Sequence, residues 1–559
     1  MNSIFLLIAG LGFMALGFFI YSKFIAEKVF KFSEDFKTPA HEFNDGIDYV
    51  PSNKYVLWGH HFTSVAGAAP IIGPAIAVIW GWVPAFIWVV FGTIFMAGVH
   101  DMSAIWASVR NRGQSMGFIV GKVIGGRARA LLMVVIFLLL LMVNTAFGTV
   151  IARMMVNTPS SVLPVWGALV VAFIIGQAIY RFKLSLPIVS IVGVIALYAL
   201  IWAGPQVPLA LPTEMMGMSS TGWWILILFA YAAIASLLPV WMLLQPRDYI
   251  NGLQLFIGLG ILYVSIMLFA PDVVAPAFNE NMPNGTPPIM PLLFVTIACG
   301  AISGFHGLVS SGTTSKQINN EKDIRFVGYF GAMGEGMLSL GAIIAATAGF
   351  ATLADWEAVY TAFGKGSIGA FINGGGEIIN QGVGISKEIS VTMLTVMAAL
   401  FAGTTMDTGV RLQRYIVQEF GEIYNLPALK NGTVATLSAV GICIGLVFGT
   451  GGDDGAGGLT IWPLFGTTNQ LMAGLTLLIV SVMLLRKGIK SWYTLLPMAF
   501  LLAMTVMALL IQLQSFYAKE QWLLLVLDII ILIASILVSF ECVSVLRKEW
   551  PSKEKEAVK

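Results

Sequence analysis

The chain has 559 residues, of which 57% are hydrophobic and 11% charged, and its formal net charge is +2. Soluble domains carry about 25% charged residues, so the composition excludes a soluble enzyme, and it is too apolar for a disordered chain. The small net charge gives no indication of a nucleic-acid partner. The scattered cysteines (Cys299, Cys443 and Cys542) form neither a disulfide framework nor a CxxC motif. The class of protein that remains is a polytopic membrane protein.

Apolar runs of the length that a membrane span needs, about 20 residues, follow one another along the chain. Strands of a membrane barrel would be about 10 residues long with alternating polarity, so these runs predict helices. The first has no basic residue before it and no A-x-A pattern after it, which favours a retained helix over a signal peptide. The runs are 3–22, 58–81, 84–108, 130–152, 161–180, 186–203, 222–244, 250–270, 291–312, 327–353, 391–410, 433–449, 464–485, 493–514 and 522–546.

Positive charge orients the predicted helices, because cytoplasmic loops are enriched in Lys and Arg. If residue 1 lies outside and the runs alternate, only four of the 31 basic residues fall in outside loops: Arg153, Lys365, Lys387 and Lys519. We therefore predict an odd number of spans, with the N-terminus outside and the C-terminus in the cytoplasm. The longest segments between runs (about 23–57, 109–129, 271–290 and 354–390) are too short to build separate cores.

Two prolines and two glycines interrupt the second run within residues 67–74. Proline removes a backbone donor and clashes with the preceding turn, so the pattern predicts an unwound stretch near the middle of the membrane. Transporters bind substrate at such interruptions, although a simple kink is the alternative. The residues predicted to contact substrate here are Gly67, Ala68, Ala69, Pro70 and Gly73.

The seventh run holds a weaker version of the same pattern, with Ser236 and Pro239 as its predicted substrate contacts. In the alternating topology it runs opposite to the second run and lies five helices later. Five helices followed by five of opposite orientation indicate an inverted repeat. The predicted division is therefore 1–57 for the first helix and its loop, 58–203 and 204–432 for the two halves, 433–546 for additional helices and 547–559 for a charged tail.

Ionisable residues inside the runs are costly in a membrane and are functional by default. His60 and His61 begin the second run, His100 and Asp101 lie in the third, and His306 lies in the ninth. They could relay protons, since histidine titrates near neutral pH, or they could be interhelical hydrogen-bonding residues. A zinc site is a further alternative, but no HExxH-like spacing supports it. Interfacial anchoring competes with function for His60 and His61, whereas Asp101 and His306 are the favoured functional residues.

Further polar residues extend this set. Glu335 has no local charged neighbour and is a second candidate for ion coupling. The spacing of His306, Ser310 and Thr314 places all three on one helix face, and the hydroxyls of this segment could instead ligate sodium. Asp407 and Arg411 are spaced i, i+4, which predicts a structural ion pair on one helix. The hydroxyl residues in question are Ser310, Ser311, Thr313 and Thr314.

Several segments together resemble the carbon starvation protein A (CstA) family, and the resemblance covers about residues 1–545. It implies a bacterial inner-membrane transporter that is induced when carbon runs out, with uptake of peptides or pyruvate and proton coupling for pyruvate. It also implies the LeuT-like fold of the APC superfamily, in agreement with the five-plus-five pattern. The segments are 59–74 (GHHFTSVAGAAPIIGP), 98–101 (GVHD), 245–249 (QPRDY), 310–317 (SSGTTSKQ), 407–411 (DTGVR) and 462–470 (WPLFGTTNQ).

The sequence therefore predicts an all-α polytopic protein that imports a small carboxylate, pyruvate ahead of short peptides, by proton symport, with sodium as the alternative coupling ion. No cofactor and no resident metal are expected, and the lipid bilayer is its surrounding partner. Two other functions stay open at this point. One is an intramembrane metal-dependent enzyme built on His60, His61, His100 and Asp101, and the other is a nutrient receptor that signals without transport.

Overall fold

The computed structural model describes residues 1–559 apart from 47, 239–243, 453–455 and 550–559. Within the described residues, thirteen helices are long and apolar enough to cross a membrane. They are built from α1 (Ser3–Leu16) with η1 (Gly17–Ser22) and η2 (Ile25–Phe30), α5 (Trp82–Gly92) with η4 (Thr93–Ala97) and α6 (Gly98–Val109), α8 (Gly126–Asn157), α9 (Val162–Tyr180), α10 (Leu186–Ala203), α11 (Ser220–Leu237), α12 (Leu244–Phe269), η8 (Arg325–Tyr329) with α16 (Phe330–Ala348), α19 (Lys387–Ile423), α21 (Gly432–Gly451), α23 (Trp462–Arg486), α24 (Trp492–Ala518) and α25 (Trp522–Glu549).

The remaining elements are shorter. They are α2 (Pro39–Glu42), α3 (Lys54–Val65), α4 (Ala69–Ala77), η3 (Val78–Trp80), α7 (Met116–Val123), η5 (Pro159–Ser161), η6 (Gly204–Gln206), α13 (Ile289–Thr296), α14 (Ala298–Ala301), α15 (Gly304–Gly312), η7 (Thr314–Lys316), α17 (Leu353–Val359), α18 (Ser367–Val383), α20 (Pro427–Lys430) and α22 (Ala456–Thr460). A small antiparallel pair, β1 (Glu214–Met215) and β2 (Met218–Ser219), precedes α11. Each predicted run falls on one or more of these helices, and the predicted all-α polytopic class is confirmed.

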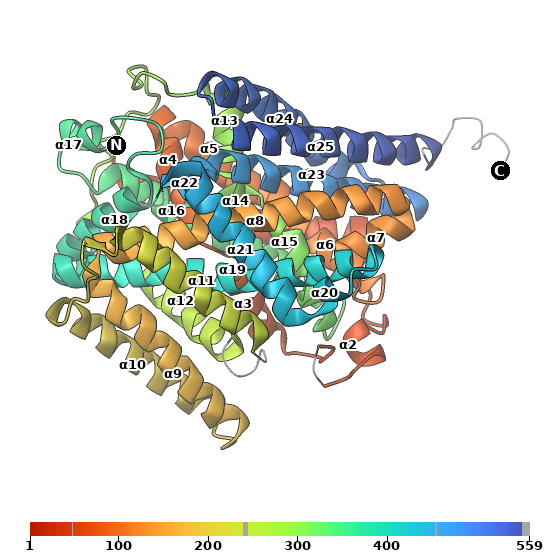
Figure 1. The fold of residues 1–559 in the computed structure, drawn as a ribbon, viewed down its shortest axis with the longest axis horizontal. Coiled ribbons are helices and arrows are strands. Elements are labelled where there is room, and N and C mark those ends of the chain that lie inside the picture. The colour runs from red at the N-terminus through yellow and green to blue at the C-terminus, as the bar shows by residue number, and fades with distance from the viewer. Residues whose placement is uncertain (47, 239–243, 453–455, 550–559) are drawn as a thin grey trace.

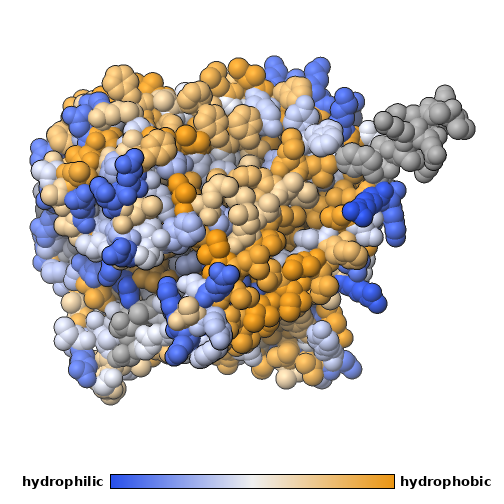
Figure 2. Space-filling view, turned by 90° about the horizontal axis from the view of Figure 1, so that it is seen from above, coloured by the Kyte–Doolittle hydropathy of each residue, from blue (hydrophilic) through white to orange (hydrophobic). Residues whose placement is uncertain are grey.

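The helices form a buried centre and an apolar periphery. Of the most apolar stretch of each helix, 94% is buried inside the bundle in α23 and 89% in α16, against 33% in α10 and α25. The pair α9 and α10 lies at one edge of the bundle, and α24 with α25 lies at the opposite edge (Figure 1). Figure 2 shows broad hydrophobic areas over the upper and right-hand parts of one face, with hydrophilic residues at its two ends and in its left half. Large exposed hydrophobic areas are expected for a protein surrounded by lipid. The ionisable side chains described below belong to the buried centre.

The second run is interrupted as predicted, but over a shorter stretch. Helices α3 and α4 meet at an angle of 53°, and only residues 66–68 separate them. The predicted unwinding through residue 74 is wrong, because Pro70 sits in the first turn of α4, where its missing N–H costs no helical hydrogen bond. Pro74 cannot donate to the carbonyl of Pro70, and the Ser339 hydroxyl of α16 donates to that oxygen instead at 2.9 Å.

The ninth run is also interrupted, whereas the predicted interruption of the seventh run falls largely on residues 239–243, outside the described part of the chain. Helix α11 is continuous to Leu237, and the predicted contact Pro239 lies outside the described residues. The ninth run, in contrast, divides into α13, α14 and α15, with extended backbone at Ile302 and Ser303. It crosses the first interrupted helix closely, since a Cβ on Gly73 would lie 2.4 Å from the carbonyl oxygen of Thr296. Gly73 is therefore a packing position between the two interrupted spans.

The segment 354–390, predicted to lie between two runs, contains nearly all of two helices, α17 and α18. Helix α18 packs against α12, α16 and α19. The approach to α16 is close, because a Cβ on Gly374 would lie 2.1 Å from the carbonyl oxygen of Ala345. The N-terminus and α17 lie at one end of the bundle, whereas α2, α7 and α20 lie at the other (Figure 1).

Candidate ion-coupling and substrate site

A fully buried cluster of ionisable side chains surrounds Asp101 of α6. One carboxylate oxygen, Oδ1, lies 2.8 Å from Nδ1 of the neighbouring His100. The other, Oδ2, lies 2.7 Å from Nδ1 of His306 on α15. The side chains of all three residues are 0% exposed. An isolated carboxylate at this depth would cost several kcal/mol, so the two imidazoles are what make the site stable.

His306 also faces a second carboxylate. Its Nε2 lies 2.9 Å from Oε2 of Glu335 on α16, and Glu335 is 2% exposed. The distance is that of an ion pair, although the angle is not that of a hydrogen bond. One imidazole thus lies between two carboxylates contributed by different helices. Such a ring can take a proton on one nitrogen and release a proton from the other.

His61 joins the cluster from α3, the first half of the interrupted second run. Its Nδ1 lies 2.9 Å from the Thr314 hydroxyl, and its Nε2 lies 3.8 Å from Oδ2 of Asp101. The adjacent His60 is only partly buried. The sequence could not distinguish these two histidines. In the structure His61 belongs to the buried cluster, whereas His60 lies nearer the surface. Asp101 contacts a histidine from each interrupted span, His61 from α3 and His306 from α15.

The hydroxyl residues of the ninth run lie in different settings. Helix α15 ends at Gly312, so Thr314 lies in η7 and does not continue the helix face of His306 as predicted. Ser311 donates to the carbonyl of Gly307 at 2.7 Å, and Thr313 donates to that of Val309 at 3.1 Å. The Ser310 hydroxyl is buried without a hydrogen-bond partner in the described part of the chain. Within that same part, no three His, Cys, Asp or Glu residues are grouped so as to hold a metal ion.

The interruption between α3 and α4 is enclosed by side chains from α8 and α19. A Cβ on Gly67 would lie 2.8 Å from both the Phe147 ring and the Thr405 hydroxyl. Ala66 and Ala68 are fully buried. Of the predicted substrate contacts, Gly67 and Ala68 lie at the interruption, whereas Ala69, Pro70 and Gly73 belong to α4. Ser236 is buried near the end of α11.

The predicted ion pair between Asp407 and Arg411 is wrong. Asp407 pairs instead with Arg247 of α12 and accepts a hydrogen bond from the Tyr231 hydroxyl at 2.8 Å. Arg411 donates to the carbonyls of Ala235 and Leu238, each at 2.8 Å. The physical reason is that the last carbonyls of a helix have no partner within the helix. The end of α11 therefore binds the arginine, which leaves Asp407 for Arg247.

Asn469 of α23 is a structural residue of this region that the sequence did not single out. Its side-chain oxygen accepts from the backbone N–H of Phe305 at 2.9 Å, at the start of α15. Its amide nitrogen lies 3.0 Å from the Ser303 hydroxyl. Asn469 thus caps α15 from another helix and stabilises the interruption. The sequence signal that could have indicated Asn469 is its position in the segment 462–470, one of those that carry the family resemblance.

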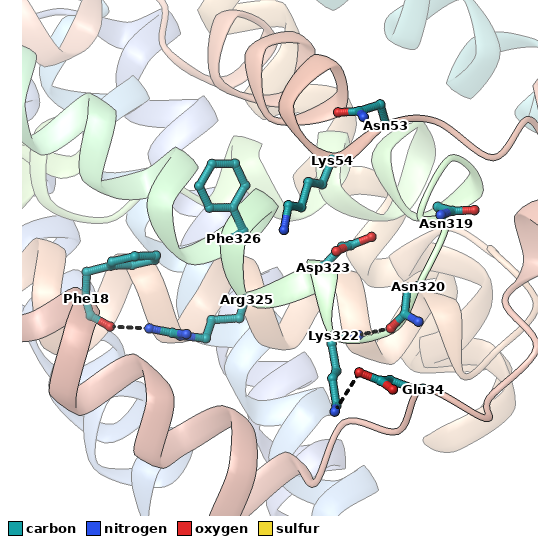
Figure 3. A pocket seen from close by; sticks show the side chains of 10 residues that line it. All are labelled: Phe18, Glu34, Asn53, Lys54, Asn319, Asn320, Lys322, Asp323, Arg325 and Phe326. Carbon is teal, nitrogen blue, oxygen red and sulfur yellow. Dashed lines mark hydrogen bonds and ion pairs between the residues drawn. The ribbon is translucent and has the colours of Figure 1, made fainter.

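A polar cavity of about 600 Å³ opens at the start of α3. Figure 3 shows its side chains, which come from η1, the loop after η2, the start of α3, the segment before η8 and η8 itself. Lys322 pairs with Glu34 at 2.9 Å, and Arg325 donates to the carbonyl of Phe18 at 2.8 Å. Asp323 lies in the same cavity, outside the spans. Its burial raises the pKa of this carboxyl above the ordinary value, and Lys54 opposes that rise.

These features define a class of protein. A bundle of many apolar helices, with two interrupted spans meeting at a buried chain of titratable groups, is the architecture of a polytopic membrane transporter. The chain belongs to the CstA family, because the model of the family "Carbon starvation protein CstA" matches residues 2–359 and 352–508.

Relatives cover nearly the whole chain. The peptide transporter CstA of Campylobacter jejuni is 32% identical over 90% of this chain and 79% of its own length. The peptide transporter CstA of Bacillus subtilis is 31% identical over 90% of this chain and 89% of its own. The pyruvate/proton symporter BtsT of Escherichia coli is 30% identical over 92% of this chain and 82% of its own.

Two solved structures overlap with most of the chain at 13% sequence identity. MhsT in complex with L-phenylalanine covers 88% of this chain and 99% of its own, with a TM-score of 0.48. A manganese transporter of Eremococcus coleocola covers 90% of this chain and 99% of its own, with a TM-score of 0.47.

Proposed function

We propose that the protein imports a small carboxylate, pyruvate or a short peptide, by proton symport across a bacterial inner membrane, with its N-terminus outside. The observation that carries this proposal is the buried series Asp101, His306 and Glu335, contributed by α6, α15 and α16. The names of the relatives, peptide transporter and pyruvate/proton symporter, support the substrate class and the coupling ion.

The arrangement of the cluster gives proton coupling a physical route. Asp101 accepts a proton, and the His306 imidazole, between Asp101 and Glu335, passes it from one carboxylate to the other. His61 lies on one interrupted span and His306 on the other. A change of charge on Asp101 therefore alters the attraction to both spans, which is the differential interaction that a conformational change requires.

The substrate is proposed to bind at the interruption between α3 and α4. Helix α4 begins at Ala69 without a side-chain cap, and the positive end of a helix favours a carboxylate. Gly67 and Ala68, which carry little or no side chain, lie directly before this helix. Pyruvate needs one carboxylate contact and one donor for its keto oxygen, which is why it ranks ahead of a peptide with a free ammonium group. The proposal also includes the division of the bundle into two inverted-repeat halves, residues 58–203 and 204–432.

Flux into proteoliposomes tests the function. Labelled pyruvate and labelled dialanine are supplied in parallel under an imposed proton or sodium gradient. We expect pyruvate to accumulate with the proton gradient and excess dialanine to leave that uptake nearly unchanged. Accumulation of dialanine together with strong inhibition of pyruvate uptake would reverse the ranking of substrates. If uptake is driven by the sodium gradient and does not depend on pH, the coupling ion is sodium. Its candidate ligands are then Ser310, Ser311, Thr313 and Thr314.

A further inference from the structure

A second buried ionic cluster lies on α11, α12 and α19, apart from the Asp101 cluster. The guanidinium of Arg247 pairs with Asp407 and donates to the Tyr231 hydroxyl at 2.8 Å. It also lies 3.3 Å from Oδ1 of Asp248. Arg247 is 2% exposed and Asp407 is 1% exposed. Arginine suits such a place because its planar guanidinium binds carboxylates in a fixed geometry.

The cluster continues as a stripe of polar side chains along α12. Arg247, Asn251 and Gln254 are spaced i, i+4, i+7 and therefore share one helix face. The amide nitrogen of Asn251 donates to the Thr404 hydroxyl of α19 at 3.1 Å. Gln254 is 0% exposed. The stripe thus runs along the buried contact between α12 and α19.

Many polar atoms of this stripe are unsatisfied. They lack a hydrogen-bond partner among the described residues, although each buried donor or acceptor left in this state costs about 1–3 kcal/mol. A stripe that served only to hold helices together would satisfy its own atoms. The atoms are Nε of Arg247, Oδ1 of Asp407, Oδ1 of Asn251, both amide atoms of Gln254 and the Thr405 hydroxyl.

The stripe reaches the interruption of the second run. Thr405, the neighbour of Thr404 on α19, is the residue whose hydroxyl meets Gly67. On α12, a Cβ on Gly252 would lie 2.8 Å from the side chain of Thr63 on α3. A molecule at the interruption therefore lies next to the buried, unsatisfied Thr405 hydroxyl. The preceding residue of α19, Thr404, contacts the stripe on α12 through Asn251.

We propose that the carboxylate of the substrate binds Arg247, and not the start of α4, and that Asp407 occupies the guanidinium in its absence. The proposal rests on the proposed function, in which the substrate is a small carboxylate. Asn251, Gln254 and Thr405 supply hydrogen bonds to the rest of the molecule. Substrate and Asp407 then compete for one guanidinium, so that binding releases Asp407 from α12 and loosens the contact between α12 and α19.

The charges of the cluster make this exchange a competition between two anions for one guanidinium. Arg247 faces two carboxylates, Asp248 and Asp407, and the nearby Arg411 is held by the carbonyls at the end of α11. Two carboxylates already face this one guanidinium, and an entering anion adds a further negative charge. The Tyr231 hydroxyl, the other titratable group in contact, donates to Asp407. An entering substrate anion therefore has to displace Asp407 before it pairs with Arg247.

Two substitutions with opposite expected effects test the proposal. Dissociation constants of pyruvate and dialanine are measured on the purified full-length protein. Arg247→Met should weaken binding of the transported compound by about tenfold or more, the effect of losing one charge-assisted contact. Asp407→Asn should strengthen it by about tenfold, because the charged competitor for the guanidinium is gone. Asp248 still pairs with Arg247 in this variant.

The matched control is Arg129→Met, since Arg129 of α8 also pairs with a carboxylate, that of Glu419, and neither residue belongs to the cluster or to a predicted substrate contact. It should leave both constants unchanged. Weaker binding in Asp407→Asn, or unchanged binding in Arg247→Met, would overturn the proposal, and the Asp407→Asn arm decides even if Arg247→Met does not fold. Failure of the proposed function shows separately, as wild-type protein that accumulates neither compound.

Discussion

Nδ1 of His306 lies 2.7 Å from Oδ2 of Asp101, and the two residues are 205 positions apart in the chain. His306 belongs to an interrupted span and Asp101 to a continuous one, so this contact joins spans of two different kinds. Its strength depends on how many protons the pair holds, because an imidazolium attracts the carboxylate more than a neutral ring does. The first two predictions follow from this dependence.

Asp101→Asn should abolish accumulation driven by a proton gradient while preserving exchange of labelled substrate between the two sides. The amide keeps the shape and hydrogen-bonding capacity of the side chain but cannot accept the proton. Counterflow and gradient-driven uptake in the same proteoliposomes measure the two activities. The control is Asp528→Asn, at a buried aspartate of α25 outside the cluster, which should behave as wild type. Intact accumulation in Asp101→Asn would exclude Asp101 as the carrier.

Glu335→Gln should slow proton-coupled uptake and leave substrate affinity unchanged. Glutamine retains a polar contact to Nε2 of His306, but it removes the second carboxylate that receives the proton. Uptake measured against substrate concentration separates the two effects, with a lower maximal rate and the same half-saturating concentration expected. A change confined to the half-saturating concentration would instead assign Glu335 to substrate binding.

The parts of this site that the sequence predicted are those with a local signal. Asp101, His306 and Glu335 each stand out as ionisable residues inside an apolar run, so their burial could be predicted one by one. The partner of Asp407 could not, because Arg247 lies 160 positions away and spacing along one helix points only to Arg411. The pairing depends on which helix ends leave carbonyls unsatisfied, and that is decided by packing.

The two interrupted helices show the same limit. The first carries prolines and glycines, and its position was predicted correctly. The second is interrupted at Ile302 and Ser303 with no proline from residue 297 to residue 304. Its irregular backbone is stabilised by Asn469 from α23. A cap that comes from a distant helix leaves no pattern in the segment that it caps.

Gly67→Ala and Gly73→Ala should differ, although the sequence alone predicts that both glycines affect only the substrate. The added methyl at Gly73 would meet the Thr296 carbonyl oxygen at 2.4 Å. This oxygen belongs to the backbone and cannot move away as a side chain can. We therefore expect a loss of about 1–3 kcal/mol of stability and less folded protein. At Gly67 the methyl meets side chains that can move. This variant should fold and bind substrate more weakly, as thermal unfolding and binding assays would show. Equal stability of the two variants would contradict the packing role of Gly73.

Asn469→Ala should lower stability by about 1–2 kcal/mol, the usual effect of removing an N-terminal cap. The Phe305 N–H loses its acceptor inside the bundle, where no water replaces it. Thermal unfolding in detergent measures the loss, and Asn469→Asp, which retains an acceptor oxygen, is the informative comparison. Asp should recover part of the loss. If the alanine variant is as stable as wild type, the cap contributes nothing and the interruption has another origin.

The stability of the folded protein should depend on pH through Asp323, which lies in the polar cavity at the start of α3. Because burial raises the pKa of Asp323 in the folded protein, the folded state binds the proton more tightly than the unfolded state does. Stability is then unaffected below about pH 4, the ordinary pKa of aspartate, and falls as the pH rises through the window between that value and the raised one. Asp323→Asn should remove this fall and raise the melting temperature near neutral pH by about 1 °C, with little change at about pH 4. Lys54→Met should act in the opposite direction, since the Lys54 charge opposes the raised pKa. Melting curves of the wild type and both variants across this range test the assignment, and a neutral-pH gain shared by both substitutions would show that Asp323 is not the titrating group.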